Sequence, residues 1–180
     1  MKNWLPGSVN QLLIIASTVF LANLQTSLWP NLFGAFPAPM LWIPSIIFIA
    51  INRTLKEGLI AVVLISLILP SLSSMIIGHM ILINLTLFFT LRFVKERFYW
   101  QGPSYVILAS AGAALLFHVY HLAYTLVIDD HPISSPDLVR FIGEVSLTPV
   151  VGPVLYSWMQ KIDAITKKEP IIEESGPKLV

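Results

Sequence analysis

The sequence predicts an all-α fold: a polytopic membrane bundle of about six transmembrane helices, with both chain ends on the cytoplasmic side. Hydrophobic residues make up 56% of the 180 residues and charged residues 12%, whereas a soluble domain carries roughly a quarter charged residues. The mean hydropathy of +0.77 also indicates a membrane protein. The chain is a succession of apolar runs near membrane-spanning length, and its basic residues are confined to alternate connections.

The first predicted crossing, Val9–Trp29, holds about the 20 residues that a helix needs to cross the hydrocarbon core. We expect it to end at Trp29 and Pro30, because tryptophan favours the membrane interface and proline interrupts helices. The uncharged segment Asn31–Pro39 is expected to lie at the interface or to re-enter the membrane. The second crossing, Met40–Ile51, is short and contains a proline, so we expect it to be kinked or sheltered by neighbouring helices.

The third and fourth predicted crossings are Leu59–Leu72 and Met75–Leu91, and the turn between them is marked only by serines. The basic and aromatic run Arg92–Gln101 is the strongest polar break in the chain, and we expect it to end the fourth crossing. Its default role is to anchor the topology; the alternative is to bind a cytoplasmic partner or anionic lipid headgroups. The fifth crossing, Pro103–Ile128, is the longest, and the acidic loop Asp129–Asp137 follows it.

The sixth predicted crossing runs from Asp137 to Asp163 and is broken by Pro149, Gly152 and Pro153. These three residues fall near the middle of the membrane, where a backbone freed from helical hydrogen bonds must be buried in protein. Residues 1–164 are predicted to form a single transmembrane bundle. Residues 165–180, which are charged and contain proline and glycine, are predicted to be a disordered cytoplasmic tail.

The placement of charges predicts the orientation. With six crossings and a cytoplasmic N-terminus, every lysine and arginine except Arg140 falls on the cytoplasmic side. Membrane proteins carry their excess of basic residues in short cytoplasmic loops, and five crossings would distribute these residues over both sides. We therefore expect both ends inside, with the turns around Arg53 and Arg92 available to cytoplasmic partners.

Two histidines of the fifth crossing are the first candidates for a site. His118 and His121 lie three residues apart, so they share a helix face. A metal would need further ligands, and the possible donors reproduce no known metal spacing; they are His79, Asp129, Asp130, His131 and Glu144. We expect the histidines to line the bundle interior or to approach the outer interface, and we expect no metal or other cofactor.

Glu144 is the one acidic residue well inside an apolar crossing. An isolated carboxylate there costs about 2.5–3.5 kcal/mol on insertion scales. Arg140 precedes it by four residues on the same helix face, so we prefer a structural Arg140–Glu144 pair to a proton relay. Together with His118 and His121, this pair marks a possible cavity or interface.

The fifth crossing also carries small residues four apart, Ala109 with Ala113 and Ser110 with Ala114. Small faces let helix backbones approach closely, and packing within the bundle explains them better than docking of a partner helix. The chain has no cysteine and no nucleophile elbow, zinc-protease motif or phosphate-binding loop. We therefore expect no enzymatic activity and no nucleic-acid partner.

Two runs carry a family resemblance over Leu12–Asp163. The first predicted helix ends in a Gln-Thr-Ser-Leu-x-Pro run, in which Gln25, Ser27 and Pro30 stand at fixed places. The last helix has a small-residue and proline break before a Lys-x-Asp exit; its members are Pro149, Gly152, Pro153, Lys161 and Asp163. These runs resemble the MreD family of rod shape-determining membrane proteins. Two aspartates common in that family have no counterpart, which puts any function that depends on them in doubt.

The resemblance implies a non-enzymatic, multi-pass component of the bacterial inner (cytoplasmic) membrane that helps to maintain cell shape in the cell-elongation (rod) complex. Such a protein would dock an MreC-like membrane protein. Through that partner it would link MreB filaments to the peptidoglycan synthases RodA and penicillin-binding protein 2.

The alternative is a substrate-binding S component of an energy-coupling-factor vitamin transporter, which is also a six-helix bundle of similar length. S components often dock their coupling subunit through an Ala-x-x-x-Ala face on helix one. Here Ala16 and Ala22 are six residues apart and do not form that face. In favour of the alternative, the polar residues of the fifth crossing would border a vitamin pocket.

Overall fold

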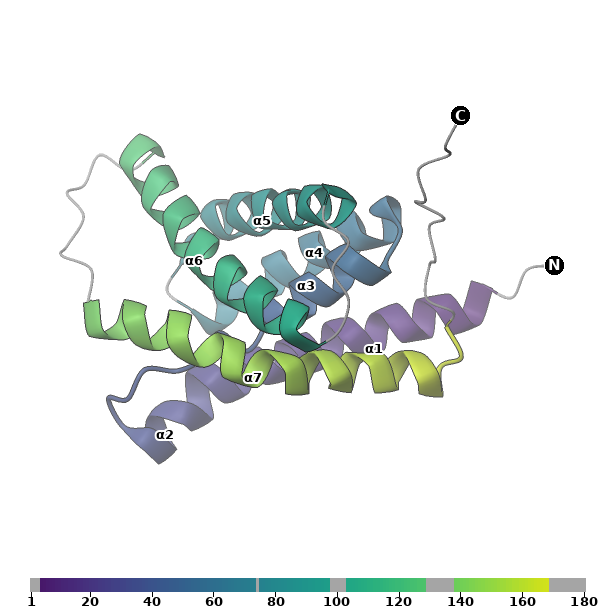
Figure 1. Cartoon of the computed structure of the whole chain (residues 1–180), viewed down its shortest axis with the longest axis horizontal. Helices are drawn as coiled ribbons and strands as arrows, with labels where there is room; N and C mark the ends of the chain where they lie inside the picture. The colour runs from purple at the N-terminus through teal and green to yellow at the C-terminus, as the bar shows by residue number, and fades with distance from the viewer. Residues whose placement is uncertain (1–3, 74, 98–102, 129–137, 169–180) are drawn as a thin grey trace.

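The computed structural model describes residues 4–73, 75–97, 103–128 and 138–168, and every regular element in these ranges is helical. The all-α prediction is therefore confirmed. In chain order, the elements are α1 (Trp4–Asn23), a π-helical turn (Leu24–Leu28), α2 (Trp29–Phe33), α3 (Ile43–Asn52), α4 (Leu55–Ile68), a 3₁₀ turn (Leu69–Leu72), α5 (Ile77–Arg97), α6 (Pro103–Ile128) and α7 (Leu138–Ile165) (Figure 1).

Five helical spans are long and apolar enough to cross a membrane: α1 with α2, α4 with its 3₁₀ turn, α5, α6 and α7. Their outward faces carry large apolar side chains, for example Phe20, Leu108 and Val150, which are 61%, 56% and 70% exposed. An apolar surface of this extent is stable against lipid and unstable against water. The protein is therefore embedded in a membrane.

The core is built around α3, a short apolar helix. All residues from Ile43 to Ala50 are buried, and α3 packs against α4, α5, α6 and α7. Its 10 residues correspond to about 15 Å, half of a hydrocarbon core. The prediction of a sheltered second segment is confirmed, but the helix is shorter than Met40–Ile51, and Pro44 lies in its first turn, where proline is tolerated.

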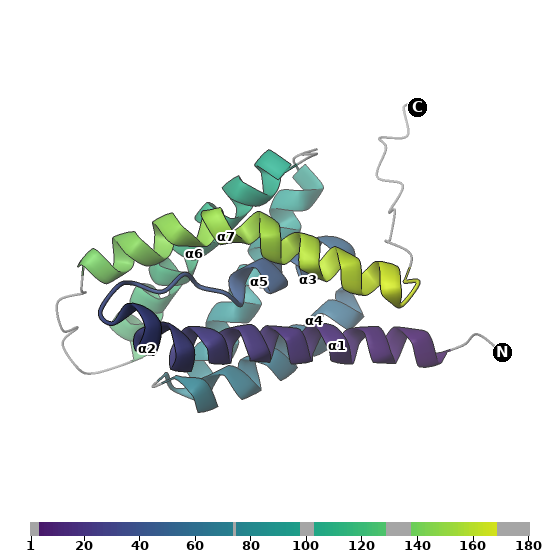
Figure 2. The same ribbon diagram turned by 90° about the horizontal axis from the view of Figure 1, so that it is seen from below.

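Helix α3 alone is too short to span a membrane, and the irregular segment between α2 and α3 precedes it. Figure 2 shows this segment running back between α1 and α7. Two of its backbone N–H groups are satisfied by side chains: Leu41 donates to Gln25 Oε1 at 2.9 Å, and Met40 donates to Thr148 Oγ1 at 3.0 Å. Irregular backbone is tolerated at membrane depth only when protein groups satisfy it in this way.

The first helical span does not end at Trp29 and Pro30, as the sequence predicted. The π-helical turn leads directly into α2, and Pro30 lies in the first turn of α2, where proline is tolerated. The span ends after Phe33 at Gly34, whose φ of 61° lies in the left-handed region that glycine adopts readily. Proline thus continues this span and glycine terminates it.

The basic run that was expected to end the fourth crossing at Arg92 is partly helical, since α5 continues to Arg97. Arg92 Nη1 donates to the Arg53 carbonyl at 3.0 Å, and Lys95 Nζ donates to the Ile51 carbonyl at 2.7 Å. Both cations therefore stabilise the carboxyl end of α3, where the last helix carbonyls lack intrahelical partners and positive charge is favourable. The remaining residues of the run lie outside the described residues.

Helices α6 and α7 pack closely along the small face of α6. Ser110, Ala113 and Ala114 are at most 1% exposed, and a Cβ on Gly152 of α7 would overlap the Ser110 side chain. The small residues therefore pack within this bundle, as predicted. The bounds of α6, Pro103–Ile128, also agree with the prediction.

The sixth predicted crossing is a single helix, α7, which continues through Pro149 and Pro153. The disordered tail was predicted to begin at residue 165. Helix α7 ends at Ile165, and the turn formed by Thr166, Lys167 and Lys168 is held by hydrogen bonds to α7 backbone carbonyls. The remainder of the predicted tail and the acidic loop between α6 and α7 lie outside the described residues.

Candidate functional site

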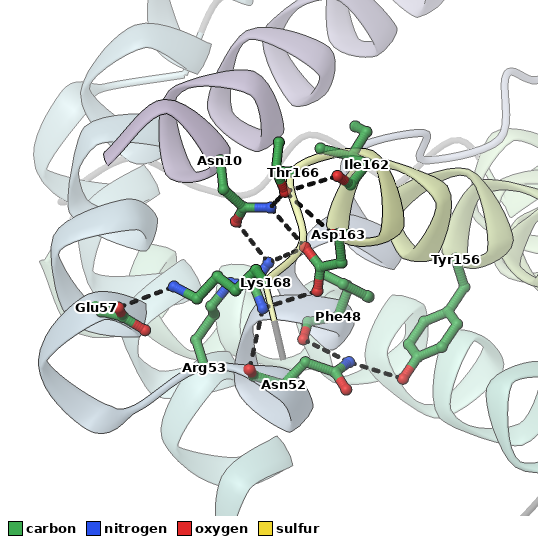
Figure 3. A network of polar contacts seen from close by, with 10 residues as sticks. All are labelled: Asn10, Phe48, Asn52, Arg53, Glu57, Tyr156, Ile162, Asp163, Thr166 and Lys168. Carbon is green, nitrogen blue, oxygen red and sulfur yellow. Dashed lines mark hydrogen bonds and ion pairs between the residues drawn. The ribbon is translucent and has the colours of Figure 1, made fainter. Parts of the chain in front are cut away.

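A polar cluster ties together the end of the bundle where α1 begins and α7 ends (Figure 3). At its centre Arg53, which follows α3, makes a two-pronged contact with Asp163 of α7. Nη1 donates to Oδ2 at 3.0 Å and Nη2 donates to Oδ1. The side chains of Arg53 and Asp163 are 2% and 14% exposed. Planar, two-pronged pairing of this kind is the strongest form of a carboxylate–arginine interaction.

Asn10 of α1 joins this pair from a third segment. Its Oδ1 accepts from Arg53 Nη2 at 2.9 Å, and its Nδ2 donates to Asp163 Oδ1 at 2.8 Å. The same Nδ2 donates to Thr166 Oγ1 at 2.6 Å. Asn10 is fully buried, so its amide must be hydrogen-bonded, because an unpaired buried amide costs several kcal/mol. The cluster therefore joins α1, the α3–α4 turn and α7.

Peripheral contacts extend the cluster in two directions. Tyr156 OH of α7 accepts from Asn52 Nδ2 at 2.8 Å. Beyond the end of α7, Lys168 Nζ donates to Glu57 Oε1 of α4 at 2.9 Å. The Arg53 guanidinium also lies 5.1 Å from the centre of the Phe48 ring. With its charges paired and its amides engaged, the arrangement is suited to fastening helices together.

This cluster was not predicted from the sequence. The turn around Arg53 was expected to be available to cytoplasmic partners, whereas Arg53 is 3% exposed. Asp163 was expected only as a member of a family motif. An arginine and an aspartate that each lie at the end of an apolar segment could have indicated this contact. Helix ends on the same side of a bundle lie close together.

A second polar cluster lies at the other end, where α7 begins. Arg140 Nε donates to Glu144 Oε1 at 2.8 Å, and this confirms the predicted pairing of the two residues. His118 of α6 brings Nε2 to 3.1 Å from Glu144 Oε2, a contact that the sequence did not predict. Glu144 is 5% exposed, whereas the Arg140 side chain is 73% exposed. The buried carboxylate is thus shared between a lipid- or water-facing cation and an imidazole.

The other predicted site residues lie apart from this contact. His121 is half-buried on α6. Gln25 is buried and holds the segment before α3. Ser27 is exposed and donates to Asn23 Oδ1 at 2.8 Å. Among the described residues, no three His, Asp or Glu side chains are grouped as a metal site requires.

We expect Glu144→Gln to lower the free energy of unfolding in detergent by about 1 kcal/mol or less, because the amide oxygen still accepts from Arg140 and that exposed cation remains solvated. Arg140→Leu should cost more, because it leaves a buried carboxylate with His118 alone. Denaturant titration of both purified variants checks this order. A larger loss for Glu144→Gln would contradict the structural role of the pair.

A cavity of about 390 Å³ opens at this same end, beside Arg140. It is bordered by the π-helical turn, α2, the following segment, the turn before α5 and the start of α7; its described lining residues are Gln25, Thr26, Trp29, Pro30, Gly34, Ala35, Phe36, Pro37, Ala38, Leu72, Ser73, Val139 and Arg140. None of them belongs to α6.

Comparisons of the chain with protein-family models, with curated proteins and with solved structures find no match.

Proposed function

We propose that this chain is a non-enzymatic component of the bacterial cell-elongation (rod) complex, of the MreD type, in the inner membrane. The observation that carries the proposal is the resemblance of the Gln25–Pro30 run and the Pro149–Asp163 run to that family. The contacts of these residues support it. Gln25 accepts a hydrogen bond from the backbone before α3, and Gly152 lets α6 pack closely against α7. Asp163 joins α7 to Arg53 and Asn10. The resemblance therefore rests on residues that the bundle needs.

The proposed mechanism is lateral docking in the membrane. An MreC-like membrane protein would bind an outward face of the bundle, and through it the chain would link MreB filaments to RodA and penicillin-binding protein 2. On the cytoplasmic side, exposed cations such as Lys56 and Arg97 would contact the partners. Arg53 is buried and Arg92 donates to the end of α3.

The proposed orientation places the Arg53–Asp163 cluster inside and the Arg140–Glu144 cluster outside. The chain lacks cysteine, so single-cysteine variants at the exposed positions Lys56 and Ser71 report each side without background. A membrane-impermeant maleimide should label Ser71→Cys in intact spheroplasts and label Lys56→Cys only after lysis. The opposite pattern would reverse the orientation.

The functional test is depletion of the chain in its own rod-shaped host, combined with purification of the tagged protein in mild detergent. We expect depleted cells to become round, and we expect an MreC-like protein to co-purify, identified by mass spectrometry. Rod-shaped depleted cells, or a purified complex that lacks an MreC-like protein, would contradict the proposal. Co-purification of an ATPase-linked coupling subunit would instead favour the vitamin-transporter alternative.

A further inference from the structure

The cavity beside Arg140 contains a buried side chain with unused hydrogen-bond donors. Gln25 is 8% exposed, and its Oε1 accepts the Leu41 N–H at 2.9 Å. This contact fixes the orientation of the amide, because a backbone N–H can only donate. The Nε2 group of Gln25, with its two N–H bonds, then belongs to the cavity wall and donates to no group in the described part of the chain. The Nε2 group can therefore donate to an acceptor that enters the cavity.

The charges that border the cavity favour a negatively charged acceptor. Arg140 is a lining residue, whereas its partner Glu144 is not, and the described lining residues include no acidic side chain. Arg140, whose Nε donates to Glu144, contributes its guanidinium to the cavity wall. The Ser73 hydroxyl accepts from the Met75 N–H, so its hydrogen remains to donate. The polar part of the wall thus offers N–H and O–H groups and one positive charge.

The surroundings of the cavity mouth are apolar. Leu32, Phe33 and Phe36 are 64%, 53% and 56% exposed, and Phe36 lines the cavity together with Trp29. A ligand with an anionic head and an apolar remainder would match both parts. The volume of about 390 Å³ lies at the lower end of the range for small-molecule sites and suffices for a head group.

We propose that this cavity binds an anionic oxyacid group, a phosphate or a carboxylate, by hydrogen bonds from Gln25 Nε2, Ser73 and Arg140. The group belongs either to a phospholipid of the adjoining leaflet or to a free solute, and the same donors recognise it in both cases. The proposal goes beyond the rod-complex function and does not depend on it.

Gln25→Glu is the variant that separates binding from folding. The carboxylate still accepts the Leu41 N–H, but it removes both Nε2 donors and places a negative charge in the cavity. Gln160→Glu is the matched control, because Gln160 is an exposed residue in the last turns of α7 and the change in net charge is the same. Ala35→Trp is a second variant that fills the cavity without removing a side-chain hydrogen bond. The thermal midpoint of each variant without ligand establishes that it is folded.

The measurement is the thermal midpoint and the native mass spectrum of the purified protein with phosphatidylglycerol, with phosphatidylcholine and with inorganic phosphate or acetate. We expect phosphatidylglycerol to bind more tightly than phosphatidylcholine, and Gln25→Glu and Ala35→Trp to weaken this binding by about tenfold or more, with Gln160→Glu unchanged. A shift with phosphate or acetate alone that depends on Gln25 would identify a free solute as the source. Absence of anion binding, or binding that is unaffected by both cavity variants, would overturn the proposal.

Discussion

Arg53→Met is expected to lower the free energy of unfolding by about 3–5 kcal/mol, because it leaves Asp163 and Asn10 buried without their cationic partner. The measurement is a denaturant titration of the purified protein in detergent, monitored by the circular dichroism signal of its helices. Lys161→Met is the matched control, because Lys161 is an exposed cation of the same end and should change stability by about 0.5 kcal/mol or less.

A double variant separates the pair interaction from the cost of a single unpaired charge. In Arg53→Met with Asp163→Leu, neither charge remains, so most of the stability lost in Arg53→Met should return. Losses that simply add would show that the two residues act independently. Such a result would contradict a role for the two-pronged contact in joining α3 to α7.

Gly152→Ala is expected to destabilise the bundle by about 1–3 kcal/mol, because the added Cβ would overlap Ser110 and force α6 away from α7. Gly112→Ala is the control on α6, where an added Cβ meets nothing within 4 Å. It should be neutral or stabilising by up to about 1 kcal/mol, since alanine is the better helix former.

The combination of Gly152→Ala with Ser110→Gly should recover part of the lost stability, because the nearest remaining atom, the Val106 carbonyl oxygen, lies at 3.9 Å from the added Cβ. Thermal midpoints of these three variants and of the unchanged protein in one detergent test this order. Equal effects of the two Gly→Ala changes, or no recovery in the combination, would show that the close approach of α6 and α7 does not limit the packing.

The elements that the sequence predicts well are those decided by local chemistry. Helix α6 is an uninterrupted apolar run that begins at a proline, and both bounds were correct. The Arg140–Glu144 contact follows from a spacing of four within one helix. Buried packing of Ser110, Ala113 and Ala114 follows from their size. None of these requires knowledge of a distant segment.

The errors arise where the geometry of the adjoining backbone or a distant segment decides the outcome. Pro30 was expected to end a helix, but the π-helical turn before it places the ring in a first turn. The turn around Arg92 was expected to be available to cytoplasmic partners, but Arg92 donates to the carboxyl end of α3. The Arg53–Asp163 contact joins residues 110 positions apart, so helix periodicity could not reveal it. The cavity beside Arg140 likewise depends on the path of the segment before α3.

The short, fully enclosed α3 constrains how the protein is made in the cell. A helix of 10 residues cannot cross the bilayer alone, and the extended segment before it would expose unpaired backbone groups to lipid. The two segments can therefore settle only after later parts of the chain have emerged from the ribosome, because α4 to α7 supply the walls around α3. Biogenesis thus has an obligatory late step, in which a segment synthesised early is enclosed by helices synthesised after it.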